Sequence, residues 1–405
     1  MHKYKKLLFS SLGSAFEYYD LAIYSVFAVA IGNKFFDGSS TVSNTLLVFM
    51  VYIIGYVIRP VGAWFFGHLA DKHGRAFVLR LNMLLLFFST LALVFLPGIE
   101  SIGVAATIIF VLLRCVQAMA VGAEIPIAVI YSIENYPKRQ GLVTGIIFAC
   151  LSLGIMMTTL VLYLVTTYTS ESFAAEYGWR IGFFIGAVFT FTMFFLRKNI
   201  VDAPVSEEKI TDVSRGPSFV GKIIVGMMLV ACIAMLTTQL YMFLPSFYVM
   251  YVSSKMHLAT LMLTGSIVMA ISCVVGGYIS DYIPKDKLMG ILIIISIALA
   301  PIFYRNLIAG EDIFYIFVAL SIVMGFFSST YNVIIVNFFN VSHRGRGLGL
   351  AYNLGYLLFS AGVPALSIVL IKSTGMVLMP VYMIVGAGVI SLIGLVLSSQ
   401  FMKKA

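Results

Sequence analysis

Long apolar stretches follow one another along almost the whole chain, and their lengths restrict the fold more than any other feature of the sequence. A helix needs about 20 apolar residues to cross the hydrocarbon core of a bilayer. With 61% hydrophobic and 11% charged residues, the 405-residue chain has the composition of a membrane protein rather than of a soluble globular one. We therefore predict an all-α membrane protein with twelve transmembrane helices. The predicted spans are 8–32, 44–67, 76–97, 102–131, 141–166, 180–196, 220–250, 259–280, 288–307, 313–337, 347–371 and 376–400.

The basic residues are distributed unevenly between the two sides of the predicted spans. If the N-terminus is cytoplasmic, 19 of the 26 lysines and arginines lie on that side, five lie on the other, and Arg59 and Arg114 lie inside spans. Connections rich in Lys and Arg remain in the cytoplasm. We therefore expect a multi-pass protein of the bacterial inner membrane with both termini cytoplasmic. The net charge of +9 then reflects this topology and contact with anionic lipid, not nucleic-acid binding.

A short glycine-containing block occurs twice, which indicates that the chain consists of two related halves. The segment Gly67 to Arg75 joins two predicted spans through a basic turn, and Gly277 to Asp281 repeats its first part. Between these copies, Arg197 to Lys222 is the only long polar connection, as expected for a flexible linker. The predicted domains are an N-terminal six-helix bundle at 1–198, a cytoplasmic linker at 199–219 and a C-terminal six-helix bundle at 220–405.

Five ionisable residues lie well inside predicted spans, and all five belong to the first four: Glu17, Asp20, Arg59, Arg114 and Glu124. A charged side chain at the centre of a bilayer costs a few kcal/mol on insertion scales, so each requires a partner or a function. Glu17 and Asp20 share one helical face, and Arg114 and Glu124 share another. We expect both faces to point into the bundle. The first half would then handle charge, while the second half supplies neutral polar groups.

Asp20 and Arg114 are predicted partners because each lies about twelve residues, roughly 18 Å of helix, from one end of its span. Burial raises the pKa of a carboxyl group, and a nearby arginine lowers it. A site with both can change protonation when the arginine moves away or binds a substrate carboxylate. We predict that Asp20 and Arg114 couple transport to protons, the alternative being a purely structural ion pair. For Glu17 and Glu124, proton coupling and structural hydrogen bonds both remain open.

Arg59 is a second candidate for recognising an anion, because a guanidinium is a planar, permanently charged fork that suits a carboxylate. The alternative is that Arg59 pairs permanently with Glu17 or Asp20 and holds the bundle together. Two arginines at this depth favour a carboxylate-bearing substrate over a sugar or a cation. The predicted substrate-binding residues are Arg59, Arg114, Tyr24, Gln117, Gln239, Tyr241, Asn332, Asn353 and Tyr356.

Several segments together resemble the major facilitator superfamily. Gly67 to Arg75 is similar to its loop motif G-x-x-x-D-r-x-G-R, and residues 13–24 resemble the G-n-x-x-E-W-Y-D-F-x-x-Y opening of its metabolite:proton symporter branch. That branch contains transporters of α-ketoglutarate, citrate, shikimate, proline and betaine. Tyr18 departs from the pattern by replacing a tryptophan, and Ala118 and Ala123 stand where glycine is usual. Further similar segments are Arg59–Gly62, Arg114–Gln117, Gly122–Glu124, Gly178–Ile181 and Gly347–Gly355.

The resemblance implies two six-helix bundles around a central cavity, with the site between them and alternating access to the two sides. It also implies a span-one acid facing a span-four arginine, at the positions of Asp20 and Arg114. At the loop motif, Asp71 would cap a neighbouring helix, where the helix dipole favours an anion, and Arg75 would pair with an acid such as Glu134. The predicted gating residues are Gly67, Asp71, Gly74, Arg75, Glu134 and Asp281.

No feature of the sequence indicates an enzyme, a cofactor or a metal site. The four cysteines lie inside spans without metal-ligand spacing, and no nucleophile–base set is visible. The leading hypothesis is a monomeric, proton-coupled importer of a small organic acid (a carboxylate) or a zwitterionic metabolite. One alternative is a proton-antiport exporter of a metabolite or drug. The absence of proline from 141–157 disfavours it, because similar exporters carry a G-P-x-x-G-G-like motif there. A more remote alternative is a non-transporting membrane sensor.

Overall fold

Every regular element in the described part of the computed structural model is a helix, as predicted. The structure describes residues 15, 18–38, 40–73, 75–121, 125, 129–130, 132–133, 136–197, 217–252, 258–339 and 344–402. The elements of the first half are α2 (Ala28–Phe35), α3 (Thr41–His73), α4 (Arg75–Phe95), α5 (Ile99–Ile102), α6 (Val104–Val121), η1 (Pro137–Arg139), α8 (Gln140–Tyr168) and α9 (Glu171–Arg197). Those of the second half are α10 (Pro217–Thr237), η2 (Thr238–Phe243), α11 (Leu244–Tyr251), α12 (Leu258–Ser280), α13 (Lys285–Ala309), α14 (Phe314–Val336), α15 (Arg344–Tyr356), η4 (Leu357–Ala361), α16 (Val363–Thr374) and α17 (Met379–Met402).

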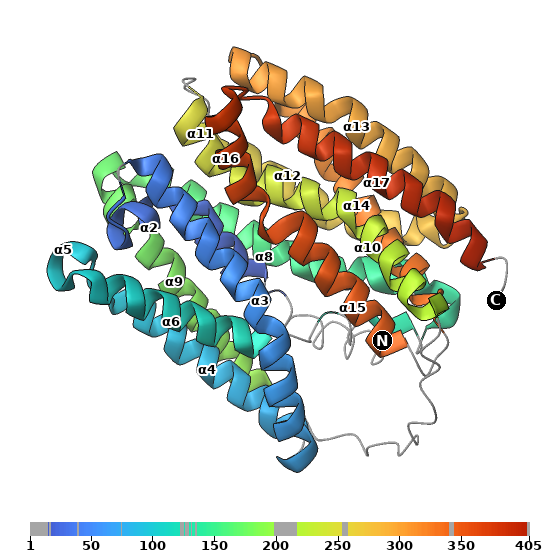
Figure 1. Ribbon diagram of the computed structural model, residues 1–405, viewed down its shortest axis with the longest axis horizontal. Coiled ribbons are helices and arrows are strands. Elements are labelled where there is room, and N and C mark those ends of the chain that lie inside the picture. Colours follow the sequence, from blue (N-terminus) through green and yellow to red (C-terminus); the bar gives the residue numbers. More distant parts are fainter. Residues whose placement is uncertain are drawn as a thin grey trace.

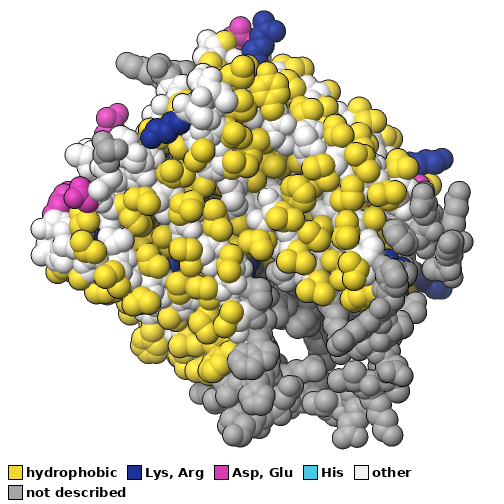
Figure 2. Space-filling view, in the orientation of Figure 1, with side chains coloured by type: hydrophobic (Ala, Val, Ile, Leu, Met, Phe, Trp, Pro, Cys, Tyr) yellow, Lys and Arg dark blue, Asp and Glu magenta, His cyan; other side chains and the backbone are white. Residues whose placement is uncertain are grey.

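The described helices have the length and surface of membrane spans. Ten of them are long and apolar enough to cross a bilayer, and Leu81–Phe95 of α4 forms a shorter apolar helix. Figure 2 shows one face of the molecule covered by hydrophobic side chains, with lysines, arginines and acids near its edges. A soluble protein would not present such a face to water. The predicted all-α membrane fold is therefore confirmed, and the apolar faces of its helices are suited to contact with lipid.

The helices form two groups that meet along α8 and α12 (Figure 1). In the first half, α4 packs against α6 and α9, and α6 packs against α3. In the second half, α10 packs against α15 and α17, and α13 packs against α14 and α17. Helix α9 ends at Arg197 and α10 begins at Pro217, with residues 198–216 outside the described part. The division into bundles at 1–198 and 220–405 with a linker at 199–219 remains a prediction.

Two predicted spans are interrupted by a short π-helix. The predicted span 220–250 contains η2 between α10 and α11, and the predicted span 347–371 contains η4 between α15 and α16. A proline stands in the first turn of the helix that follows each π-helix, Pro245 in α11 and Pro364 in α16. Proline has no N–H and cannot continue the hydrogen-bond pattern of the preceding turn. Helices commonly bend at π-helical turns, so η2 and η4 mark places where these spans can bend. Such turns are also frequent at functional sites.

Glycines allow α8 and α12 to approach each other closely where the two halves meet. A Cβ atom added to Gly145 would lie 2.3 Å from the carbonyl oxygen of Cys273, and one added to Gly277 would lie 2.4 Å from that of Gly141. Farther along, Thr159 Oγ1 lies 3.0 Å from Ser266 Oγ. From Gly141 to Thr159, α8 rises roughly 27 Å, close to the thickness of a hydrocarbon core. The α8–α12 seam, as we name this contact, therefore extends across most of the bilayer.

On the other side of the molecule, the halves touch through the first part of α3. Helix α9 terminates and α10 begins at the same side of the molecule, which we call the linker end. Helix α3 begins at the opposite side. There Lys372 Nζ lies 3.5 Å from Ser43 Oγ, and the Tyr52 hydroxyl donates to Met242 Sδ at 3.2 Å. Helix α3 also packs against η4 and α16, and in Figure 1 the ribbons of α3 and α15 diverge from there toward the linker end. On this side the contacts close the end opposite the linker.

We expect Gly145→Ala to destabilise the α8–α12 seam, because its methyl group would overlap a backbone carbonyl that cannot rotate away. Overpacking of this kind costs about 1–3 kcal/mol. Thermal unfolding of the purified protein in detergent should show a melting temperature several degrees lower than that of the unsubstituted protein. Gly386→Ala on α17 is the matched control, since a Cβ atom there meets nothing within 4 Å. Equal melting temperatures for both variants would show that the seam has room to adjust.

Candidate functional site

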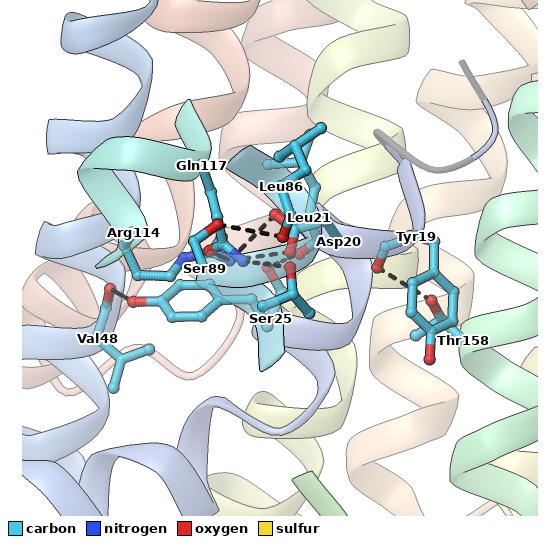
Figure 3. Close-up of polar contacts among 12 residues, drawn as sticks. Tyr19, Asp20, Leu21, Ser25, Val48, Leu86, Ser89, Arg114, Gln117 and Thr158 are labelled. Atoms are coloured by element: carbon cyan, nitrogen blue, oxygen red, sulfur yellow. Dashed lines mark hydrogen bonds and ion pairs between the residues drawn. The ribbon is translucent and has the colours of Figure 1, made fainter. Parts of the chain in front are cut away.

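A buried ion pair joins the first span to α6. Arg114 Nη1 lies 3.1 Å from Asp20 Oδ1 and 3.0 Å from Asp20 Oδ2, and the two residues are only 7% and 5% exposed. The same nitrogen donates to Gln117 Oε1 at 2.7 Å, and Gln117 Nε2 donates to Thr90 Oγ1 on α4 at 2.7 Å. Figure 3 shows the Asp20, Arg114 and Gln117 side chains pointing toward one another. The pairing of Asp20 with Arg114 predicted from helix depth is present.

An aromatic ring supports the arginine from a third side. The Arg114 guanidinium lies 4.2 Å from the centre of the Tyr24 ring, and the Tyr24 hydroxyl donates to the backbone oxygen of Val48 on α3. The Tyr24 ring also stacks against Phe110 and Tyr52, with ring centres 6.0 Å and 6.1 Å apart. A cation over a desolvated aromatic face is stabilised by the ring quadrupole. Contacts from the first span, α3, α4 and α6 therefore hold Arg114 in place.

The ion pair forms part of the wall of a pocket inside the first half. The pocket has about 380 Å³ of empty space, part of it open to solvent. Arg59 lies on the same wall, 8% exposed, with its guanidinium 4.2 Å from the centre of the Tyr56 ring. Two buried arginines therefore border one small, aromatic-lined space. The lining residues are Asp20, Leu21, Val51, Tyr52, Gly55, Tyr56, Arg59, Arg114, Gln117, Ala118 and Val121.

Six of the nine predicted substrate-binding residues do not line this pocket in the present conformation: Tyr24, Gln239, Tyr241, Asn332, Asn353 and Tyr356. In η2, Gln239 Nε2 donates to Ser367 Oγ at 2.9 Å, and the Tyr241 and Ser321 hydroxyls lie 2.7 Å apart. Both side chains are buried within the second half, which they tie together. Asn353 Nδ2 donates to the backbone oxygen of Gly349 in its own helix. Substrate contact by Gln239, Tyr241 and Asn353 remains a prediction, to which this conformation adds no support.

Tyrosines from both halves meet between the first span, α14 and α15. The Tyr18 hydroxyl donates to Tyr356 Oη at 3.3 Å and lies 3.5 Å from Tyr352 Oη. Tyr331 lies beside Tyr356, and its own hydroxyl makes no hydrogen bond of ordinary geometry. We call these four residues the tyrosine cluster. Of these four, only Tyr356 is among the site residues predicted from the sequence. The spacing of Tyr352 and Tyr356 by four residues, and the replacement of Trp by Tyr18, are the signals that could have identified more.

One predicted gating residue has a clear structural role at the linker end. Asp281 follows α12, and its carboxylate accepts hydrogen bonds from the backbone N–H groups of Gly141, at 2.7 Å, and Leu142, at 3.1 Å. It therefore caps the first turn of α8 across the two halves, the interaction that the sequence predicted for Asp71. The Arg139 guanidinium strengthens the same contact by donating to the Tyr282 hydroxyl at 2.6 Å.

The other predicted coupling and gating residues lie outside what the structure describes. Glu17, Gly74, Glu124 and Glu134 are outside the described residues. The backbones of Gly67, Asp71 and Arg75 belong to α3 and α4, but nothing is described of the surroundings of these residues. Their roles remain predictions. Within the described residues, no group of three or more His, Cys, Asp or Glu side chains is arranged to hold a metal ion.

Comparison with known proteins agrees with this architecture. Residues 10–364 match the family model described as Major Facilitator Superfamily. The putative proline/betaine transporter of Staphylococcus aureus (strain COL) is 27% identical, with 95% of this chain and 86% of the relative aligned. The proline/betaine transporter of Escherichia coli (strain K12) is 26% identical over 96% of this chain and 82% of its own.

Solved structures show the same fold. The crystal structure of a D-xylose–proton symporter superposes with a TM-score of 0.77 at 17% identity, covering 99% of this chain and 98% of the symporter. An inward-open structure of the xylose transporter from E. coli gives a TM-score of 0.73 at 16% identity, covering 98% and 96%. At these identities the likeness concerns the fold alone.

We expect Asp20→Asn to lower stability by about 3–5 kcal/mol, because removal of one partner leaves the buried Arg114 charge without its counter-ion. The double variant Asp20→Asn/Arg114→Gln, which has no buried charge at this point, should recover part of the loss. Thermal unfolding in detergent measures both. Glu100→Gln serves as a control, since it removes a pair with Lys34 whose acid is 78% exposed, and should have no measurable effect. A double variant less stable than Asp20→Asn would contradict this interpretation.

We expect Asp281→Ala to loosen the linker end of the α8–α12 seam, because loss of a helix cap costs about 1 kcal/mol. Spin labels at Lys138 and Lys287, in a background whose native cysteines are replaced, would report the separation of the two halves there. The population at the longer separation should increase. Asp312→Ala is the matched control, since Asp312 accepts from the Phe314 N–H within the second half only. Identical distance distributions in all three proteins would exclude a gating role for Asp281.

Proposed function

This chain belongs to the Major Facilitator Superfamily, and from that membership we propose that it imports a small carboxylate or zwitterionic metabolite together with protons. The family and the relatives are multi-pass membrane transporters rather than enzymes. Two relatives are named proline/betaine transporters, and both of these solutes are carboxylate-bearing zwitterions. Identities of 26–27% leave the substrate of this chain open. The choice of solute therefore depends on the chemistry of the site.

The observation that carries the proposal is the buried Asp20–Arg114 pair on the wall of the pocket. A guanidinium that faces one carboxylate can exchange it for another of similar geometry. When Asp20 takes up a proton, Arg114 loses its counter-ion and becomes available to the carboxylate of a substrate. When the substrate leaves, Asp20 releases its proton and pairs with Arg114 again. One proton and one carboxylate thus enter and leave the site together, which keeps the buried charge balanced.

The other predicted residues contribute to this scheme in graded roles. Arg59, on the same pocket wall, is a second anchor for the substrate carboxylate, and Gln117 and Tyr24 position Arg114. Glu17 and Glu124 are further candidates for proton transfer. Asp281 acts as a gate, together with the loop-motif residues predicted from the sequence.

The proposal includes a topology and a state of assembly. We place a monomer in the bacterial inner membrane, with the linker end and both termini cytoplasmic, in accord with the distribution of basic residues. In that orientation, the contacts around Ser43, Tyr52 and Lys372 close the outer end of α3. The structure then corresponds to a state closed toward the outside along α3. Rocking of one bundle against the other would expose the pocket to each side in turn.

We expect Asp20→Asn to abolish uptake against a gradient while leaving exchange intact. The amide cannot carry the coupling proton, but it still occupies the space of the carboxylate. Purified protein would be reconstituted into proteoliposomes, and accumulation of labelled proline or glycine betaine would be measured under an imposed pH gradient. Counterflow with equal pH on both sides measures exchange.

Glu100→Gln provides the control for reconstitution, because its pair with Lys34 lies on the surface. It should accumulate solute as the unsubstituted protein does. Accumulation by Asp20→Asn equal to that of this control would show that another group carries the proton. Accumulation without any pH or voltage gradient would contradict proton coupling altogether.

A further inference from the structure

We propose that the tyrosine cluster is the second half of the substrate site and takes the substituted ammonium group of a zwitterion. In this arrangement the substrate carboxylate lies at the arginines of the pocket, and its ammonium end lies against the rings of Tyr18, Tyr352 and Tyr356. The inference rests on the proposed function, since it assigns the second end of the same solute. It predicts that the substrate carries one carboxylate and one positively charged ammonium group, and that di- and tricarboxylates are not substrates.

The cluster lies across the boundary between the two halves. Tyr18 belongs to the first span and Tyr352 and Tyr356 belong to α15, and the hydroxyls of these last two lie 3.5 Å and 3.3 Å from Tyr18 Oη. Each of the three residues is at most 6% exposed. The contact is therefore made by hydroxyl groups on rings that belong to different bundles. Motion of one bundle against the other must open or close it.

The packing of α3 against η4 and α16 places the cluster at the depth of the pocket. Near the start of α3, Ser43 contacts Lys372 of α16. Ten residues after Ser43, the Cδ1 atom of Ile53 lies 3.8 Å from a Cβ position built on Gly362, which comes ten residues before Lys372. The two segments therefore run antiparallel in constant register. Six residues farther, roughly 9 Å of helix, this register brings Arg59 to the level of Tyr356. An arginine of the pocket and a tyrosine of the cluster thus lie at the same depth, on facing bundles.

The charges of the site determine which group each end can accept. Among the described residues, the buried charged side chains are Asp20, Arg59 and Arg114, all in the first half. A second carboxylate on the substrate would therefore meet no buried cation among the described residues of the second half. A substituted ammonium finds a suitable partner there, because the faces of aromatic rings attract cations. The rings of Tyr352 and Tyr356 lie side by side, with centres 4.6 Å apart and planes tilted by 36°, as two adjacent walls of such a site.

Buried polar groups in and next to the cluster that make no hydrogen bond of ordinary geometry are a second, independent indication of a ligand. Asn332 on α14 is fully buried beside Tyr331, and neither its Oδ1 nor its Nδ2 makes a hydrogen bond of ordinary geometry. The same holds for the buried hydroxyl of Tyr331, the cluster member that precedes it in the chain. Leaving buried polar groups unpaired destabilises the folded protein, so proteins rarely retain them without a purpose. A secondary ammonium such as that of proline would donate to Asn332 Oδ1, while a fully methylated one would contact the rings alone.

The cluster also borders a point at which α15 can bend. Tyr356 is the last residue of α15, and the π-helix η4 begins at Leu357. A π-helical turn has weaker regular hydrogen bonding and is frequent at functional sites. Rearrangement of η4 would move Tyr352 and Tyr356 relative to α16 and separate their hydroxyls from Tyr18. The site can therefore admit a solute without unfolding any helix.

The test compares two ligands of one shape and two sets of variants. Glycine betaine and 3,3-dimethylbutanoate differ only in that a quaternary nitrogen replaces a quaternary carbon. Binding to the purified full-length protein is measured by calorimetry. We expect betaine to bind about tenfold more tightly to the unsubstituted protein, as a desolvated cation–aromatic contact predicts. Tyr352→Phe/Tyr356→Phe should keep most of this preference, because the rings remain, and Tyr352→Leu/Tyr356→Leu should lose it.

Two controls separate the loss of rings from general damage. Tyr315→Leu removes a tyrosine that is 78% exposed on α14 and should leave the preference unchanged. The Leu variant should still bind 3,3-dimethylbutanoate, which shows that the carboxylate end of its site is intact. If the Leu variant fails to fold, the comparison of the two ligands in the unsubstituted protein and the Phe variant still decides the question.

The outcomes distinguish this inference from the proposed function. Equal affinity for the two isosteres, or tighter binding of succinate than of betaine, would overturn the ammonium site while leaving carboxylate transport in place. A loss of preference in the Phe variant as large as in the Leu variant would assign the effect to hydroxyls and overturn the cation–aromatic contact. Failure to bind any carboxylate would overturn the proposed function itself.

Discussion

The cost of placing charge inside hydrocarbon governs the arrangement of the first half. A buried arginine requires an acid within reach, and Arg114 obtains one from Asp20 on a different helix. The remaining hydrogen bonds of the site then follow: Gln117 orients the guanidinium, and Thr90 orients Gln117. These contacts fix the relative positions of the first span, α4 and α6. The same interaction that holds the bundle together also supplies a group that can exchange one carboxylate for another.

The two halves contribute different chemistry. The buried charges described by the structure belong to the first half, while the second half presents hydroxyls, amides and aromatic rings. Between them the α8–α12 seam has close glycine contacts near the linker end, where the Asp281 cap adds a polar contact, and a hydroxyl contact between Thr159 and Ser266 farther along. On the opposite side, α3 touches η4 and α16. These two contacts between the halves differ in character, since one is extended and the other lies near a π-helix, and the tyrosine cluster adds a third.

Much of this architecture could be predicted from the sequence, because hydrocarbon thickness fixes the length of each apolar span and depth fixes which charges can meet. The pairing of Asp20 with Arg114 followed from those two constraints. The π-helices η2 and η4 could not be predicted, since a change of hydrogen-bond register leaves an all-apolar pattern unaltered. For the same reason the sequence did not show that Gln239 and Tyr241 face into the second half. The spacing of Tyr352 and Tyr356 places them on one helical face, but their contact with Tyr18 depends on the register between distant helices, which this local pattern does not reveal.

The confinement of described buried charge to one half has an electrical consequence. The Asp20–Arg114 pair is neutral, and a zwitterionic solute adds no net charge, so each proton taken up adds one positive charge to the loaded carrier. Moving one elementary charge across a potential of 100 mV changes its free energy by about 2.3 kcal/mol, which can support a roughly fiftyfold ratio of solute concentration between the two sides. With a zwitterionic substrate, a carrier that works as proposed would therefore be electrogenic. Voltage alone, negative inside, would drive accumulation even where the pH is equal across the membrane.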